Sequence, residues 1–382
     1  MEKSMHLTQK QIDYCMECGV CTGSCPVSRE LPSFSPRQMI RRAVMKLDGD
    51  LLQSRELWAC LSCARCSVGC PVDIDFPEFI RSQRQEARKA GNLPQESHHG
   101  ILQAISSLQT RDIKQQRTGW AEEAGTFRDT GEYFYFVGCL PYFDVTFRYL
   151  DFSPLDAARS VLTLLNKMGV EPVISNHERC CGHDALWSGD EATFRELARW
   201  NLDAIKSSGA KTVLFSCPEG YVTFKDYYPK YFGELPFQVL HMTELLAREL
   251  PGAGLSFQPS AQGAITYQDP CRLGRMAGIY EPPRQLLQLV AEDELVEMER
   301  NRENALCCGT SAWMECSSYS KAMQIERLQE AIQTGAQALI TACPKCQIHL
   351  TCAQIGTDLD LRVTDLYAYL LERLRAEEAH GR

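Results

Sequence analysis

Short apolar runs alternate with amphipathic stretches from residue 132 to the end of the chain. The runs are typical of buried strands, and they lie at residues 132–137, 172–175, 212–216, 265–268 and 338–341, with 295–298 in an equivalent place. Apolar positions at helical spacing predict helices at residues 155–168, 190–206, 282–290 and 320–334, and Thr243 and Thr364 are expected to cap two more. This alternation indicates α/β units.

The N-terminal part of the chain carries helical signals only. Ser35 and Pro36 provide an N-cap and a first-turn proline for a helix with apolar positions from Met39 to Leu47. Asp75 begins a second helix that is expected to end at Gly91. Long helices here favour an α-helical domain.

Residues 91–131 are rich in Gln, Ser, Gly, Glu and Arg, with one modest apolar patch at 101–108. We interpret them as a connector in which His98 and His99 are exposed. The expected organisation is therefore a lead-in and helical domain at 1–90, a connector at 91–131, and two α/β units at 132–258 and 262–382.

Composition narrows the class of protein. The net charge is −9, from 40 basic and 49 acidic residues, which argues against nucleic acid as a main partner. Residues 1–10 are polar and contain no apolar signal core, and no window reaches the length of a membrane helix. We therefore expect a cytoplasmic protein without direct membrane insertion. The 19 cysteines then point to metal ligation, because disulfides are rare in a reducing compartment.

Two cysteine runs share one spacing in the helical part. They are Cys15-x2-Cys18-x2-Cys21-x3-Cys25-Pro26 and Cys60-x2-Cys63-x2-Cys66-x3-Cys70-Pro71. Paired runs of this kind are the signature of ferredoxins with two [4Fe-4S] cubane clusters, in which the fourth cysteine of each run reaches the other cluster. One cluster is therefore assigned to Cys15, Cys18, Cys21 and Cys70, and the other to Cys60, Cys63, Cys66 and Cys25. A pair of zinc knuckles is the weaker alternative, because zinc sites use cysteine pairs.

Cysteine-bearing turns of the first α/β unit recur in the second. Cys139, Cys180 and Cys217 precede Cys271, Cys307 and Cys343 by 132, 127 and 126 positions, and Thr243 precedes Thr364 by 121. This regularity indicates an internal duplication. Because each cysteine turn follows a strand, both sets are expected at the carboxyl ends of the strands, where sites in such sheets usually lie.

The second copy holds five cysteines, one more than an ordinary zinc site or cubane uses. They are Cys271, Cys307, Cys308, Cys343 and Cys346. Adjacent cysteines rarely bridge each other without strain, but they can ligate two atoms of one cluster. The first copy has Gly220 in the place of Cys346 and retains Cys139, Cys180, Cys181 and Cys217.

These motifs resemble the heterodisulfide reductases. Residues 11–90 are similar to the ferredoxin-like subunit, and residues 132–376 are similar to the catalytic subunit with its five-cysteine CCG motif. The resemblance implies a non-cubane [4Fe-4S] cluster on the five cysteines of the second copy. It leaves zinc or a simpler iron–sulfur cluster for the four of the first. The expected fold is multidomain, with an α-helical two-cluster ferredoxin domain followed by a duplicated α/β CCG-domain pair.

Two functions follow from this resemblance. One is a subunit of a heterodisulfide reductase-like complex that passes electrons to a thiol–disulfide or other acceptor. The other is an electron-transfer adaptor without a substrate site, as in glycolate oxidase or class II benzoyl-CoA reductase complexes. A zinc-stabilised scaffold does not explain the paired cysteine runs. The chain contains no Walker A run and no Gly-x-Gly-x-x-Gly turn opening a helix, so flavin or nicotinamide is expected on a partner such as a flavoprotein subunit.

Four residues near the motifs have competing interpretations. Cys316 and Cys352 are expected to be small buried residues, with rescue ligation by Cys316 as the alternative. His183 is expected to be a structural histidine rather than a ligand or proton donor. Lys345 is expected either to offset thiolate charge or to lie in solvent.

Overall fold

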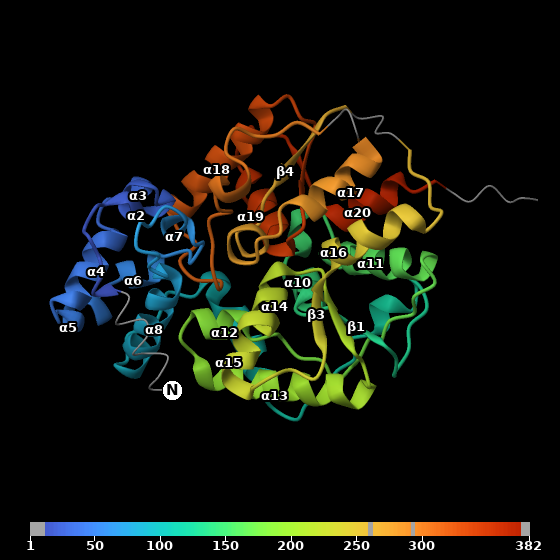
Figure 1. The fold of residues 1–382 in the computed structure, drawn as a ribbon, viewed down its shortest axis with the longest axis horizontal. Helices are drawn as coiled ribbons and strands as arrows, with labels where there is room; N and C mark the ends of the chain where they lie inside the picture. Colours follow the sequence, from blue (N-terminus) through green and yellow to red (C-terminus); the bar gives the residue numbers. More distant parts are fainter. Residues whose placement is uncertain (1–11, 259–262, 292–294, 376–382) are drawn as a thin grey trace, which may run out of the picture.

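The computed structural model describes residues 12–258, 263–291 and 295–375. Most of the expected lead-in at 1–14 lies outside these residues, as do the two ends of the second α/β unit at 262 and 376–382. Figure 1 shows the helical N-terminal part beside the α/β body, which contains both sheets. In the described part of the chain, no helix combines the length and hydropathy that a membrane crossing requires.

Short helices surround the two cysteine runs of the N-terminal part. They are α2 (Val20–Gly23), α3 (Pro26–Glu30), α4 (Pro36–Val44), α5 (Asp48–Leu52), α6 (Glu56–Ala59), α7 (Arg65–Val68) and α8 (Phe76–Lys89). The Ser35 side chain accepts a hydrogen bond from the Gln38 amide, and Asp75 does the same for Glu78, so both predicted N-caps are present. The apolar faces of α4 and α8 are buried, which fixes the loops that carry the cysteines.

Each α/β copy is built on a small parallel sheet. The first sheet has the order β1 (Tyr133–Phe136), β2 (Thr212–Phe215) and β3 (Gln238–His241), and the second has β4 (Ile265–Gln268), β5 (Ala338–Thr341) and β6 (Arg362–Asp365). Tyr133 is in register with Thr212 in one sheet, and Ile265 with Ala338 in the other. The central strands β2 and β5 are buried at every position, as expected of apolar parallel strands.

Helices cover these sheets and join the copies. The first copy contains α10 (Leu140–Thr146), α11 (Leu155–Lys167), α12 (His183–Trp187), α13 (Glu191–Ser208), α14 (Pro218–Val222), α15 (Tyr228–Phe232) and α16 (Met242–Glu249). The second contains α17 (Glu281–Ala291), α18 (Ser318–Gln333), α19 (Pro344–Gln354) and α20 (Leu366–Arg373). Helix α11 packs on α20 and helix α16 packs on α17, so the first long helix of each copy contacts the last helix of the other (Figure 1).

Three sequence predictions need correction. Thr243 and Thr364 do not cap helices: the caps are His241 and Asp365, each at the end of a strand that the pattern did not predict. The runs at 172–175 and 295–298 contribute only single bridges, from Val173 to Phe134 and from Leu295 to Ile265.

The expected connector is also more than a linker. It contains helix α9 (Ile101–Leu108) over the predicted apolar patch. Glu96 pairs with Met314, and Ser97 donates a hydrogen bond to the Trp313 carbonyl, so this segment is tied to the second copy. His98 is half-buried against Phe147 and Trp313 rather than exposed.

Candidate iron–sulfur sites

The two ferredoxin-type runs bring their thiols into two groups. One small cavity with apolar walls that include Ile74 and Phe76 is lined by the cysteines assigned to the first cluster and by Cys66; the assigned residues are Cys15, Cys18, Cys21 and Cys70. Cys25 lies instead among the second group, where burial, together with the charges of Cys63 and Cys60, raises its pKa to about 12. Each fourth cysteine thus sits with the opposite run.

Backbone amides point at several of these sulfurs. The Ser62 amide donates to Cys60 Sγ at 3.3 Å, and the Ile74 amide donates to Cys70 Sγ at 3.4 Å. Arg84 is completely buried and donates to the carbonyls of Leu57, Trp58 and Cys60. Donors of this kind stabilise thiolates, so the loops are arranged for negatively charged sulfur.

The second copy gathers all five of its predicted cysteines from three turns. Their thiols form a chain of hydrogen bonds in the order Cys271, Cys307, Cys308, Cys346 and Cys343. Hydrogen bonds from Cys307 and Cys346 hold the pKa of Cys308 well below its ordinary value. Four of the five are buried, and Cys271 is half-buried.

One thiol of the ferredoxin-type part reaches this five-cysteine group. Cys63 shares a hydrogen bond with Cys307, and this bond lowers the pKa of Cys63 to about 5. Arg275 lies at the same place: it follows Cys271 in a short π-helix and donates to the Cys63 carbonyl at 2.6 Å. The second ferredoxin-type group and the second CCG motif are therefore in direct contact.

The first copy holds four thiols and a glycine. Cys139 and Cys180 lie with their sulfurs 3.2 Å apart, and Cys181 hydrogen-bonds to Cys180. Burial raises the pKa of Cys217 well above its ordinary value. Gly220 faces this group, because a β-carbon placed on it would lie 3.9 Å from the Cys181 β-carbon.

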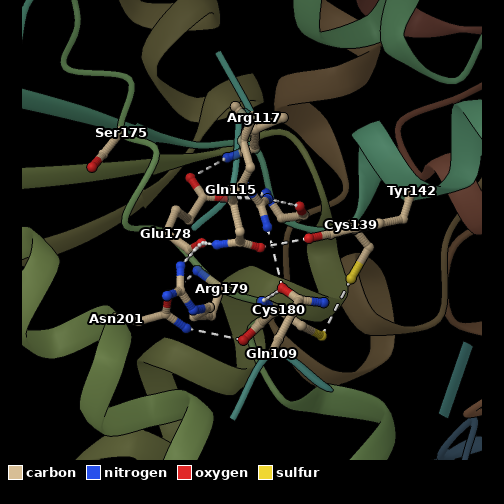
Figure 2. Close-up of polar contacts among 12 residues, drawn as sticks. Gln109, Gln115, Arg117, Cys139, Tyr142, Ser175, Glu178, Arg179, Cys180 and Asn201 are labelled. Atoms are coloured by element: carbon tan, nitrogen blue, oxygen red, sulfur yellow. Dashed lines mark hydrogen bonds and ion pairs between the residues drawn. The ribbon is translucent and has the colours of Figure 1, made fainter. Parts of the chain in front are cut away.

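A buried polar network, drawn in Figure 2, holds Cys139 and Cys180 from behind. Glu178 accepts hydrogen bonds from the Val137 and Gly138 amides and forms an ion pair with Arg117 at 2.9 Å. Burial raises the pKa of Glu178 to about 7.

The same network fixes the backbone of Cys180 (Figure 2). Gln109 Oε1 accepts from the Cys180 amide at 2.9 Å, and Asn201 Nδ2 donates to the Cys180 carbonyl at 2.9 Å. Gln109 and Arg117 both belong to the segment predicted as a connector, so that segment is part of the first site.

A charged cluster links the two CCG motifs. Lys345 is buried, and its ammonium group pairs with Glu219 at 2.6 Å and with Asp184. His183 is also buried: its Nδ1 faces Asp184 at 3.0 Å, and its Nε2 accepts a hydrogen bond from Arg272 at 3.1 Å. The interpretation of Lys345 as a solvated lysine is wrong, because two carboxylates from the first copy hold it in the interior.

These carboxylates were missed by sequence reasoning. Ligand atoms of His183, Asp184 and Glu219 lie within 4.8 Å of one another, as in a metal site, but the Lys345 ammonium already neutralises both carboxylates. A comparison of the two copies contains the signal: Glu219 precedes Lys345 by 126 positions, the same offset as Cys217 and Cys343.

The two cysteines outside the motifs differ from expectation. Cys316 is exposed and Cys352 is half-buried, so neither is a buried core residue. Cys316 interacts electrostatically with Cys352 rather than with the five-cysteine group, which does not support the rescue-ligand alternative.

The donor sets fit iron–sulfur clusters. All 19 cysteines are free thiols, and 17 of them belong to the groups described above. Soft thiolate ligands in groups of four or five, with backbone amides and arginines beside them, are the chemistry that holds such clusters. The first copy offers four thiolates, which suits either zinc or a cluster.

Comparison with known families agrees with this geometry. The model of a 4Fe-4S dicluster domain matches residues 11–74. The model of the cysteine-rich domain CCG matches twice, at residues 133–225 and 265–351. The two CCG matches coincide with the two copies, and the dicluster match covers both ferredoxin-type runs.

Similar proteins of known name belong to reductases and related oxidoreductases. The chain is 31% identical over 268 residues to a subunit of the dihydromethanophenazine:CoB–CoM heterodisulfide reductase of Methanosarcina barkeri, covering 68% of this chain and 63% of that protein. It is 28% identical to the corresponding subunit from Methanosarcina mazei over 96% of this chain and 95% of that protein. The probable iron–sulfur-binding oxidoreductase FadF of Bacillus subtilis is 30% identical over 65% of this chain and 34% of its own length.

A solved structure shares the fold. The crystal structure of a hypothetical protein from Helicobacter pylori covers 90% of this chain and 67% of its own, with a TM-score of 0.53 and 12% identity. Two independent domain matches, the duplicated cysteine turns and the similarity to the Methanosarcina mazei protein along almost the whole chain agree with one another. The chain belongs to the iron–sulfur proteins of the heterodisulfide reductase family, in which a 4Fe-4S dicluster domain precedes two cysteine-rich CCG domains.

Proposed function

We propose that this chain is the iron–sulfur subunit of a reductase complex, in which the ferredoxin-type part accepts electrons and the second CCG site delivers them to a thiol–disulfide or related acceptor. The hydrogen bond between Cys63 and Cys307 carries this proposal. It brings a ligand candidate of each site into contact within one folded unit.

The proposed ligand sets follow the grouping of the thiols. Two cubanes are assigned to Cys15, Cys18, Cys21 and Cys70 and to Cys60, Cys63, Cys66 and Cys25. A non-cubane cluster is assigned to the five cysteines of the second copy, and zinc or a simpler cluster to Cys139, Cys180, Cys181 and Cys217. Bound clusters supply one-electron transfer, which thiols alone do not.

The protein groups around the second site have distinct tasks. Arg275 lies close to Cys63, Cys271 and Cys307 and offsets their negative charge. Gln324 donates to the Cys308 carbonyl at 3.2 Å and fixes the turn after the adjacent cysteines. Burial of four of the five thiols excludes water, so charge on them depends on these neighbours.

A partner is part of the proposal. Relatives are named as subunits of a heterodisulfide reductase and as an EtfAB:quinone oxidoreductase. A flavoprotein or other reductase subunit, bound to the ferredoxin-type part, is therefore proposed as the electron donor.

A second function is supported by the burial of the second site. A substrate needs access to the reacting sulfur, whereas electron transfer between proteins does not. Cys308 is 6% exposed and Cys346 is 3% exposed. This arrangement also suits an adaptor that relays electrons to another subunit.

The test uses the full chain, purified and reconstituted without oxygen. We expect about 12 irons from two cubanes and one non-cubane cluster. After reduction by dithionite, mixing with a small disulfide should reoxidise the protein. Cys346→Ser should lose about four irons and slow reoxidation at least tenfold, while Cys352→Ser serves as a matched control outside the motifs.

Three outcomes are distinguishable. Full iron content in Cys346→Ser would refute the five-cysteine assignment. A wild-type protein that reduces no disulfide but reoxidises with a co-purifying reductase subunit would favour the adaptor. Loss of iron from the ferredoxin-type part in Cys346→Ser would show that the two sites do not form independently.

A further inference from the structure

A cavity of about 450 Å³ lies at the junction of the ferredoxin-type part and the second copy. Its walls come from three regions: the α2–α3 segment, the loop that contains Cys63 and Arg65, and the second copy around Arg275, Arg300 and Cys307. This volume lies within the range of small-molecule sites. The cavity is lined by charged and polar groups, and none of its described lining residues is acidic.

The cavity is larger than a cluster site needs. The cavity lined by the other ferredoxin-type cysteines has a volume of about 30 Å³. Of the four cysteines assigned to the second cluster, only Cys25 and Cys63 line the larger cavity. Cluster binding by these two cysteines therefore accounts for only one wall.

Four guanidinium groups line this cavity, and they are neutralised unequally. Arg29 forms ion pairs with Glu30 and Glu326, and Arg300 forms ion pairs with Glu326 and Glu330. These two arginines already have carboxylate partners. They do not need a ligand to balance their charge.

The other two arginines donate hydrogen bonds only to neutral groups among the described residues. Arg65 donates through Nη1 to the Glu303 carbonyl at 2.7 Å and to Asn304 Oδ1 at 2.6 Å. Arg275 donates to the carbonyls of Cys63, Glu303 and Ala305. Nε and Nη2 of Arg65 have no hydrogen-bond partner in the described part of the chain, which leaves one edge of this planar group available for a two-point contact.

A hydroxyl group on the same cavity is also unsatisfied. Ser24 lines the cavity, and its Oγ is covered from solvent without a hydrogen-bond partner among the described residues. Such a group is costly unless a ligand or water completes it. It adds a neutral donor beside the two arginines.

We propose that this cavity binds a small organic or inorganic anion through a phosphate or carboxylate group, held by Arg65, Arg275 and Ser24. The site lies against Cys63 and Cys307, at the contact between the two redox sites. The proposal concerns binding alone and does not depend on the acceptor proposed above.

The competing explanation is that these arginines only balance thiolate charge. Arg275 lies close to Cys63, Cys271 and Cys307, which suits that role. It does not explain the unpartnered Ser24 hydroxyl or the size of the cavity. The two explanations differ in what happens when Arg65 is changed.

Calorimetric titration of the cluster-loaded full chain with sodium phosphate and with sodium succinate, at constant ionic strength, tests the proposal. At least one probe should bind. Arg65→Gln should weaken binding about tenfold to a hundredfold, because it removes a charged hydrogen-bond donor. Ser24→Ala should weaken it less, by about threefold to tenfold. Arg29→Gln, on the same wall but paired with carboxylates, should change it by less than about twofold.

Iron content and midpoint potentials are measured on the same samples. The proposal is overturned if neither probe binds at millimolar concentration. It is also overturned if Arg65→Gln and Ser24→Ala both retain wild-type affinity, including the case in which Arg65→Gln shifts only the midpoint potential. Should Arg65→Gln lose iron, Ser24→Ala alone decides, since it alters neither a charge nor a cysteine. The relative affinity for phosphate and succinate then gives the chemical class of the ligand.

Discussion

Replacement of Lys345 by glutamine removes the only cation described between two buried carboxylates. The Lys345 side chain is 6% exposed, and its partners Asp184 and Glu219 are 13% and 11% exposed. Loss of one partner of a buried ion pair typically costs about 3–5 kcal/mol of unfolding free energy. Because His183 still faces both carboxylates, at 3.0 and 3.3 Å, we expect the lower end, about 3 kcal/mol.

The assay is urea denaturation without oxygen, on samples matched for iron content. Arg248→Gln is the control, since its pair with Glu249 is exposed and should contribute less than about 1 kcal/mol. Adding Glu219→Gln to Lys345→Gln should recover part of the loss, because it removes one uncompensated charge. A loss below about 1 kcal/mol, or simple additivity of the two changes, would refute the buried-pair argument.

Three further predictions concern other parts of the molecule. Gly220 has an ordinary backbone conformation, and a β-carbon there would meet only the Phe215 ring at 3.1 Å; Gly220→Cys should therefore fold and raise the metal content of the first site, and unchanged iron and zinc analysis would contradict this. Burial raises the pKa of Asp365 from 3.8 to about 7, so stability falls as pH rises through this window; Asp365→Asn should gain more in Tm at pH 8 than at pH 5, whereas a pH-independent difference would count against the argument. Arg117→Gln leaves Glu178 buried without its cation and should lower stability by about 3 kcal/mol, with metal loss confined to the first site by elemental analysis.

Much of the architecture follows from local signals. The ferredoxin-type runs are tight loops, so spacing alone predicts which thiols can meet, and the duplicated turns identify both CCG sites. Strands β3 and β6 escaped because they are four residues long and carry polar positions such as Gln238, Arg362 and Asp365. Their strand state comes from pairing with β2 and β5 rather than from propensity.

The missed site residues share a physical cause. A lysine or glutamate is normally exposed unless it is paired, and the partner of Lys345 lies 126 positions earlier in the chain. Arg117 and Gln109 are similar, because the segment that contains them has no strong pattern until it packs on the first copy. Contacts between distant segments decide these positions, and no short window contains them.

The pairing of Glu219 with Lys345 bears on the ancestry of the duplicated half. These residues occupy equivalent positions in the two copies, and they meet where the copies face each other. If two first copies formed a homodimer with this geometry, glutamate would face glutamate, and two second copies would set lysine against lysine. Like charges buried in this way are strongly unfavourable. Divergence at this single pair of positions therefore commits each half to the other, and it makes reversion to self-association of either half costly.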